Sequence, residues 1–347
     1  MRSKCIFEKI FRNLKNKRKL NIIKYNKKIL NRLDINKDHF ENYIKLKEFN
    51  NKYNTDIEDI DITELNLENK KIGNEGLKFL FKIEFKGLKE LNLSGNSISD
   101  INVFEKVNFK ELKILDLSNN KISDINILEK VNFKELKELD LSINKISDIN
   151  ILEKVNFKEL KELYLSNNKI SDINILEKEN FKKLNILYLG FNSISYINIL
   201  EEISDGSKEL YLNRKKILQN VYFNEFNILD LSNNQISYIN IFEKVKFKEL
   251  KKLYLCYNKI LDKNILEKVN FPELKELDLG SNNISNINIF EKVNFKELNK
   301  LVLNNNQISD INILEKVNFT ELKELYLCYN KISDITILRK VNFTELK

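Results

Sequence analysis

The sequence predicts an α/β solenoid with a curved parallel sheet on its concave face and short helical or 3₁₀ turns on its convex face. Three observations predict this fold. A unit of about 24 residues recurs from residue 62 onward. The first half of each unit alternates apolar and polar residues, as a half-buried strand does, and the second half has helical spacing. Such units cannot bury their apolar side alone and must stack on one another.

The recurrence is close enough to be read directly. The segment LKELDLSINKISDINILEKVNFKE, which begins at Leu136, returns at Leu160 as LKELYLSNNKISDINILEKENFKK. Other copies begin at Ile62, Leu88, Leu112, Leu184, Ser207, Phe226, Leu250, Leu274, Leu298 and Leu322. We therefore predict twelve copies in residues 58–347, with a further partial copy at Leu346. No closing cap follows it, so we expect either a truncated solenoid or a last edge covered by another chain.

The strand half and the turn half follow from spacing. Leu139 and Leu141 alternate with polar residues, which gives the period of two that a strand with one buried face requires. Ile149, Leu152 and Val155 have the i, i+3, i+6 spacing of a helical turn. Residues Ser147 and Asp148 precede that turn, where a helix cap belongs.

An Asn and a Phe recur at fixed positions. The Asn after each strand can satisfy backbone groups of the adjoining turn, so stacked copies should form an Asn ladder. The Phe near the end of each copy should form a buried aromatic spine. The Asn positions are 96, 120, 144, 168, 192, 234, 258, 282, 306 and 330, and the Phe positions are 109, 133, 157, 181, 247, 271, 295 and 319.

The frame L-x-x-L-x-L-x-x-N-x-I resembles the leucine-rich repeat family over roughly residues 62–347. Its continuation, N-x-I-S-D-I, is most similar to the short-repeat subclass of the leucine-rich regulatory subunit of protein phosphatase 1. The resemblance implies a non-catalytic protein that binds other proteins, and a phosphatase regulatory subunit is one role it suggests.

Charge and cysteine content bound the function further. The net charge of +8 comes from residues 1–50, which hold 15 basic and 5 acidic residues, whereas the remainder holds 44 basic and 46 acidic residues. A nearly neutral body disfavours nucleic acid as the main partner.

Cys256 and Cys328 share one strand position in copies that are three apart. At the usual strand spacing the two residues are about 14 Å apart, which is too far for a disulfide bond. We expect reduced surface thiols and an intracellular, cytoplasmic protein, with the nucleus left open and no membrane span.

The sequence holds no motif for catalysis. His39 is the only histidine, and there is neither a G-x-G-x-x-G nor a phosphate-binding G-x-x-x-x-G-K-[ST] loop. The acidic residues are spaced by the repeat, as on a solvated face. We therefore predict no catalytic residue, no cofactor and no metal site.

The concave strand face is where a binding function would lie, because the repeat does not dictate its exposed positions. Aromatic residues and Arg are enriched at binding hot spots, although Tyr also suits strands for structural reasons alone. Three successive copies place Tyr at the central exposed position. The predicted partner-binding residues are Tyr164, Tyr188, Phe191, Tyr211, Arg214, Asp230, Tyr254 and Tyr257. The irregular segment 201–226, close by, reads either as a decayed repeat or as a break that shapes a site.

Residues 1–57 are predicted to be helical, and the third helix carries Phe40, Tyr43, Ile44 and Phe49 after a capping box of Asp38 and Glu41. One interpretation is a cap over the open edge of the first repeat. The segment IFRNL…KLNIIKYNKKILNRL also resembles a degenerate F-box, which implies docking to a ubiquitin-ligase adaptor and a substrate-receptor role. The matching positions are Ile10, Phe11, Leu14, Leu20, Ile23 and Leu30. A third interpretation is a basic helix on acidic lipid or nucleic acid.

Overall fold

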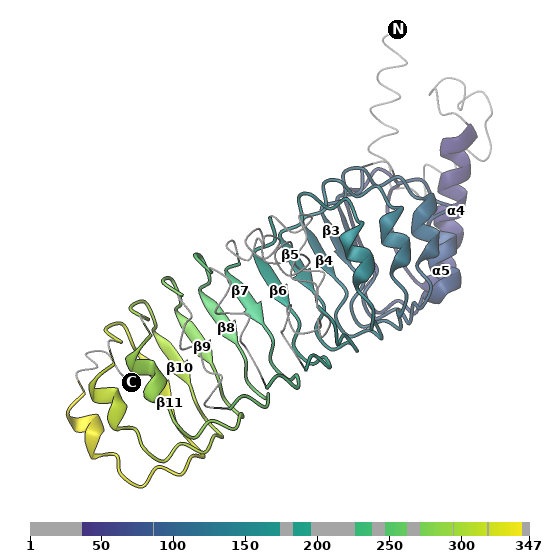
Figure 1. Cartoon of the computed structure of the whole chain (residues 1–347). Coiled ribbons are helices and arrows are strands. Elements are labelled where there is room, and N and C mark those ends of the chain that lie inside the picture. The colour runs from purple at the N-terminus through teal and green to yellow at the C-terminus, as the bar shows by residue number, and fades with distance from the viewer. Residues whose placement is uncertain are drawn as a thin grey trace, which may run out of the picture. The chain divides into compact units, whose positions relative to one another are not determined.

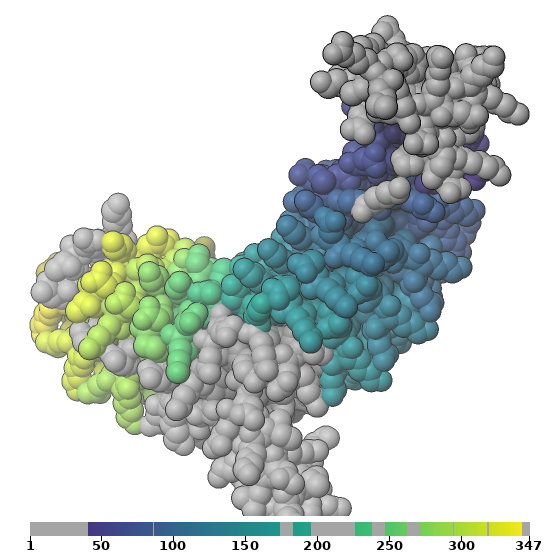
Figure 2. Space-filling view, turned by 90° about the horizontal axis from the view of Figure 1, so that it is seen from above, coloured from purple at the N-terminus to yellow at the C-terminus, as the bar shows by residue number. Residues whose placement is uncertain are grey.

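The computed structural model describes residues 37–85, 87–173, 183–195, 226–237, 247–261, 271–293, 295–317 and 319–341. The chain divides into two compact units, Met1–Leu136 and Lys137–Lys347, called here the first and second unit. Each unit stacks repeats so that strands form one layer and the short helices lie apart from it (Figure 1). The space-filling view follows the copies of the second unit in order from teal to yellow (Figure 2).

In the first unit, three parallel strands alternate with helices. β1 pairs with β2, and β2 pairs with β3, with Leu65, Leu91 and Leu115 in register. The elements are α4 (Lys37–Tyr53), β1 (Glu64–Asn66), α5 (Gly73–Leu80), β2 (Glu90–Asn92), η1 (Asn102–Lys106), β3 (Ile114–Asp116) and η2 (Asn126–Glu129), where η denotes a 3₁₀ helix.

The second unit repeats the same plan, with parallel pairing from β4 through to β11. The strands are β4 (Glu138–Asp140), β5 (Glu162–Tyr164), β6 (Ile186–Tyr188), β7 (Ile228–Asp230), β8 (Lys252–Tyr254), β9 (Glu276–Asp278), β10 (Lys300–Val302) and β11 (Glu324–Tyr326). The 3₁₀ helices described there are η3 (Asn150–Glu153), η9 (Asn288–Glu291), η10 (Asn312–Glu315) and η11 (Thr336–Arg339). The predicted solenoid fold is confirmed.

Leucines and phenylalanines of successive copies build the core. Leu274, Leu277 and Leu279 of one copy are almost fully buried, and each such side chain contributes about 1.5–3 kcal/mol by leaving water. The rings of Phe271 and Phe295 stack at 6.2 Å, and the next pair repeats this at 6.4 Å. The predicted Phe spine is confirmed for its described members; Phe181 lies outside the described residues.

The Asn ladder joins each copy to the copy before it. Asn282 donates its amide to Leu279 O and Gly280 O of its own copy and to Leu255 O of the preceding one. Its Oδ1 accepts the Ile260 N–H at 3.0 Å. This one side chain therefore contacts four backbone groups of two copies, and it is the partner of the Ile260 N–H, which the bend leaves without a backbone acceptor. The ladder is confirmed, with the same pattern at Asn234, Asn258 and Asn306.

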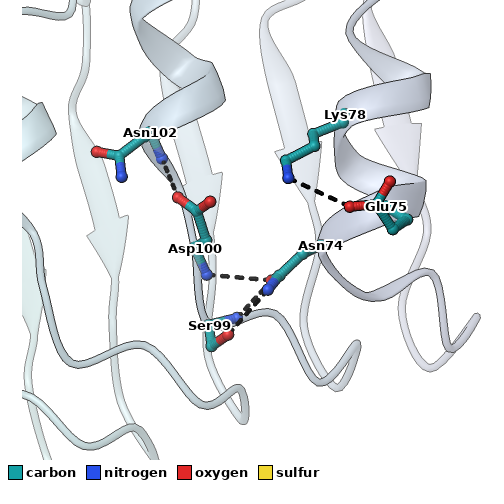
Figure 3. A network of polar contacts seen from close by, with 6 residues as sticks. All are labelled: Asn74, Glu75, Lys78, Ser99, Asp100 and Asn102. Carbon is teal, nitrogen blue, oxygen red and sulfur yellow. Dashed lines mark hydrogen bonds and ion pairs between the residues drawn. The ribbon is translucent and has the colours of Figure 1, made fainter.

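Aspartates before the 3₁₀ helices, and Asn286 before η9, fix the start of the described turns. Asp148 Oδ1 accepts the Asn150 N–H at 2.8 Å, as the predicted cap position requires. Figure 3 shows the equivalent Asp100 of the first unit holding the Asn102 N–H, while Asn74 of α5 accepts the N–H groups of Ser99 and Asp100. Side chains of one copy thus position the turn of the next copy.

The helix α4 confirms the third predicted helix and begins one residue before Asp38. It packs on α5 of the first copy: the rings of Phe49 and Phe79 lie 5.9 Å apart, edge to face. Tyr43 donates its hydroxyl to Asp59 Oδ1 at 2.8 Å, and burial together with this bond raises the pKa of Tyr43. These contacts are those of a cap; the domain boundary at residue 57 stays a prediction.

Candidate binding surface

Tyrosines on two neighbouring strands form the aromatic centre of the strand face. Tyr164 on β5 and Tyr188 on β6 are in register, and their rings stack with centroids 5.2 Å apart and planes 10° from parallel. The tight parallel spacing of the strands brings the rings together, since neighbouring strands lie about 4.8 Å apart. This pair is called the tyrosine pair below.

Hydrogen bonds to glutamates hold the rings of Tyr164 and Tyr254 in place. The Tyr164 hydroxyl donates to Glu162 on its own strand at 2.7 Å, and the Tyr254 hydroxyl donates to Glu276 on the next strand at 2.8 Å. Burial first, and then the hydrogen-bonded carboxylate, raises the pKa of both tyrosines. A ring that is already ordered loses little further entropy when a partner covers it.

The prediction of three successive tyrosines is wrong in its third member. β6 pairs directly with β7, so that Asp230 occupies the position beside Tyr188. The Asp230 charge adds to burial in raising the pKa of Tyr188. Tyr211 and Arg214 lie outside the described residues.

Exposed apolar side chains line the edge of the sheet, three residues beyond the ends of four strands. Phe191 and Tyr257, predicted from the sequence, are each 58% exposed, and they are joined by Ile143 at 48% and Tyr329 at 83%. The first three follow β4, β6 and β8, so that every second copy contributes one, about 9.6 Å from the next. We call these four residues the apolar edge.

The backbone at the apolar edge has a conformation that these residues disfavour. Its φ angles are +54° at Ile143, +56° at Phe191, +53° at Tyr257 and +55° at Tyr329. Intervening copies place Asn167, Asn233, Ser281 and Asn305 at the same position with the same φ. Asn tolerates left-handed φ, whereas a β-branched or bulky residue there is strained. The apolar residues therefore combine backbone strain with exposure to water, and both the strain and the exposure oppose folding.

Sequence reasoning did not place Ile143 and Tyr329 among the binding residues. The signal was present, because both stand directly before the ladder asparagines Asn144 and Asn330, where other copies have Asn, Gly or Ser. The requirement for positive φ at that position could not be inferred from the apolar pattern, since the position lies between the strand and the helical turn and belongs to neither periodic pattern.

The strand face of the second unit is acidic although the whole chain carries a net charge of +8. The outward positions of β4 to β11 hold seven carboxylates and two ammonium groups. The carboxylates belong to Glu138, Asp140, Glu162, Asp230, Glu276, Asp278 and Glu324, and the ammonium groups belong to Lys252 and Lys300. Both lysines are paired: Lys252 with Glu276 at 2.8 Å and Lys300 with Glu324 at 3.3 Å.

Cys256 and Cys328, expected to be reduced surface thiols, are both free; Cys328 is exposed and Cys256 is half-buried. Burial, followed by the negative charge of Asp278, raises the pKa of Cys256 to about 12. Because the thiolate is the reactive form, Cys256 is a weak nucleophile at neutral pH and serves as a hydrogen-bond donor to Asp278.

The six F-box-like positions lie outside the described residues. Within the part of the chain that the structure describes, no cluster of three or more His, Cys, Asp or Glu side chains is arranged to hold a metal ion. No described helix combines the length and the apolar character needed to cross a membrane.

The fold and the surface together define a class: a repeat solenoid that presents an open parallel sheet. Models of the leucine-rich repeat match residues 86–130, 110–154, 158–202, 296–340 and 272–287, together about half of the chain. The chain belongs to the leucine-rich repeat family. No curated protein matches the sequence.

Solved structures show the same fold. An internalin, InlF from Listeria monocytogenes, is 25% identical with a TM-score of 0.55; the match covers 87% of this chain and 93% of the internalin. The leucine-rich-repeat ectodomain of the Arabidopsis thaliana receptor kinase GASSHO1/SCHENGEN3, solved with CASPARIAN STRIP INTEGRITY FACTOR 2, is 23% identical with a TM-score of 0.50. That match covers 70% of this chain and 27% of the receptor. Leucine-rich repeat solenoids generally mediate protein–protein interactions and are typically non-catalytic.

Proposed function

We propose that this protein binds a partner protein through the strand face of its second unit, with the tyrosine pair and the apolar edge as the main contacts. The observation that carries the proposal is the apolar edge. Ile143, Phe191 and Tyr257 occupy strained backbone positions that Asn fills in alternate copies, and they expose apolar area to water. A feature that opposes folding in two ways is best explained by a gain on binding.

The tyrosine pair supports the same surface. Aromatic side chains bury a large area on binding, and these rings are already stacked on one another. Such preorganised rings suit a partner that lays a chain or a loop along the strands.

A double replacement tests the proposal. Tyr164→Ala with Tyr188→Ala is expected to weaken capture of the partner by about 30-fold or more, since a hot spot is worth about 2 kcal/mol or more. The measurement is quantitative mass spectrometry of proteins that the immobilised chain retains from extracts of its own cells, followed by affinity measurement with the leading protein.

The control for this double replacement lies on the helical turns. Lys154→Ala with Glu315→Ala changes two exposed residues and leaves the net charge unaltered. This control is expected to bind as the unaltered chain does. Equal loss in both variants, or no loss in either, would contradict binding through the strand face.

The more specific roles stay predictions from the sequence. A substrate receptor of a ubiquitin ligase would use Ile10, Phe11 and their four companions, and pulldown of the adaptor by the whole chain tests it. A phosphatase regulatory subunit would bind a phosphatase catalytic subunit through the strand face. A cytoplasmic location stays a prediction as well.

A further inference from the structure

A pocket of about 260 Å³ opens on the strand face between β8 and β11. Tyr254 lies on one side and Tyr326 on the other, and Asp278 and Val302 occupy the two strands between them, in register. We call it the Asp278 pocket. Its volume is below the roughly 300–1,000 Å³ of typical small-molecule sites, and it suits a single long side chain better than a cofactor.

Each tyrosine at the sides of the Asp278 pocket is fixed by a glutamate. Tyr254 donates to Glu276 at 2.8 Å, and Tyr326 donates to Glu324 at 3.0 Å. The two rings stand three strands apart, about 14 Å between strand axes. The pocket is therefore formed before any ligand enters, with the two anchored tyrosines at its sides and the apolar side chain of Val302 in its lining.

The chain already places its own lysines on these glutamates. Lys252 contacts Glu276 at 2.8 Å. Lys300 contacts Glu324 at 3.3 Å, and its ammonium group lies 5.5 Å from the centre of the Tyr326 ring, within the range of a cation–π contact. Lys300, Glu324 and Tyr326 thus show, within this chain, how a carboxylate and a tyrosine ring together bind a cation.

Asp278 is the carboxylate of the pocket that makes no direct ion pair, although Lys300 lines the same pocket and its charge opposes the effect of burial on the pKa of Asp278. It accepts hydrogen bonds from the Gly280 N–H at 2.9 Å and from the Cys256 thiol, and it forms no ion pair with any described residue. Burial raises the pKa of Asp278. The corresponding Asp230 also accepts a bond from the Ser232 hydroxyl at 2.6 Å, whereas Gly280 has no side chain to offer. Asp278 is thus a half-buried charge with an incomplete set of partners.

We propose that the Asp278 pocket receives a lysine or arginine side chain of the partner protein, with the charged group on the Asp278 carboxylate and the methylene stem against Val302 and the tyrosine rings. This inference rests on the proposed function, since the cation comes from the partner. The acidic character of the strand face makes a basic segment the complementary occupant. Lysine and arginine both fit this chemistry: a guanidinium gains from stacking on a ring, and an ammonium group is more compact.

Short peptides test the pocket without knowledge of the partner. The probes are acetyl-Gly-Arg-Gly-amide and acetyl-Gly-Lys-Gly-amide, and the uncharged citrulline peptide is the matched control. Binding is followed by nuclear magnetic resonance of the Val302 methyl groups and the tyrosine rings in the whole chain. We expect saturable shifts with at least one cationic peptide and a binding at least tenfold weaker for the citrulline peptide. Equal binding of all three peptides would overturn the proposal.

Two variants assign the effect to Asp278. Asp278→Asn keeps an oxygen for the Gly280 N–H and removes the charge, so we expect an unchanged or higher melting temperature and at least tenfold weaker peptide binding. Val302→Lys places an ammonium group beside Asp278 and is expected to block the pocket. The matched control is Asp140→Asn on β4, whose carboxylate accepts the equivalent Ser142 N–H. Cationic peptides should bind this control within twofold of the unaltered chain.

The partner experiment separates the two proposals. If Asp278→Asn and Val302→Lys leave partner binding and peptide binding unchanged while the tyrosine-pair variant loses the partner, the pocket assignment fails and the strand face stands. If the tyrosine-pair variant binds the partner as the unaltered chain does, the proposed function fails. Peptide binding at the pocket would then no longer support insertion of a partner side chain.

Discussion

A chain in which Ile143, Phe191 and Tyr257 are all replaced by Asn is expected to gain stability and to lose its partner. Asn tolerates the positive φ angles of these positions, which are +53° to +56°, and relief of left-handed strain is worth about 1 kcal/mol per residue. Loss of three exposed apolar contacts should weaken partner binding by about 30-fold or more. Urea unfolding measures the first effect, and affinity for the captured partner measures the second.

The reciprocal change separates strain from lost contacts. Asn119→Ile places a β-branched residue at the corresponding position of the first unit, outside the proposed binding surface, with a φ of +52°. It should lower the free energy of unfolding by about 1 kcal/mol and leave partner binding intact. If the triple Asn variant is instead less stable than the unaltered chain, the strain argument is wrong; if it binds as before, the apolar edge is not a contact surface.

Replacing Asn282 by Ala is expected to lower the free energy of unfolding by about 3–5 kcal/mol. The side chain donates to three carbonyl groups and accepts one N–H across two copies, and water cannot readily replace it at a buried site. Because each repeat is stabilised by its neighbours, the loss should also open the copies on either side. Urea unfolding and amide hydrogen exchange of the second unit measure both effects.

The neighbouring residue supplies the control for Asn282. Asn283 is exposed, and only its backbone N–H is bonded, to Ile260 O at 3.0 Å. Asn283→Ala should change the free energy of unfolding by less than about 0.5 kcal/mol. Similar losses at both positions would mean that the ladder contributes no more than any asparagine in this turn.

The features that recur in every copy could be predicted from the sequence because repetition reveals them. Asn282 and Phe295 recur at one position in many copies, and each role follows from its chemistry and spacing. The phosphatase-type resemblance and the F-box-like segment stay predictions from the sequence.

The features of single copies could not be predicted in the same way. The direct pairing of β6 with β7, which places Asp230 beside Tyr188, depends on how the chain bridges an irregular copy. The raised pKa of Cys256 depends on burial and on Asp278 in the next strand. The pocket around Asp278 depends on a Gly and a Val in two separate copies, and none of these residues is unusual in its own copy.

Site-specific photo-crosslinking tests binding through the strand face most directly. A benzophenone amino acid at Phe191 or Tyr257 is expected to crosslink to the partner, because both positions lie on the apolar edge. The same group at Lys154, exposed beside the 3₁₀ helix η3, should give no such product. Crosslinks from Lys154 but not from Phe191 and Tyr257 would place the partner on the helical turns and contradict the proposed binding surface.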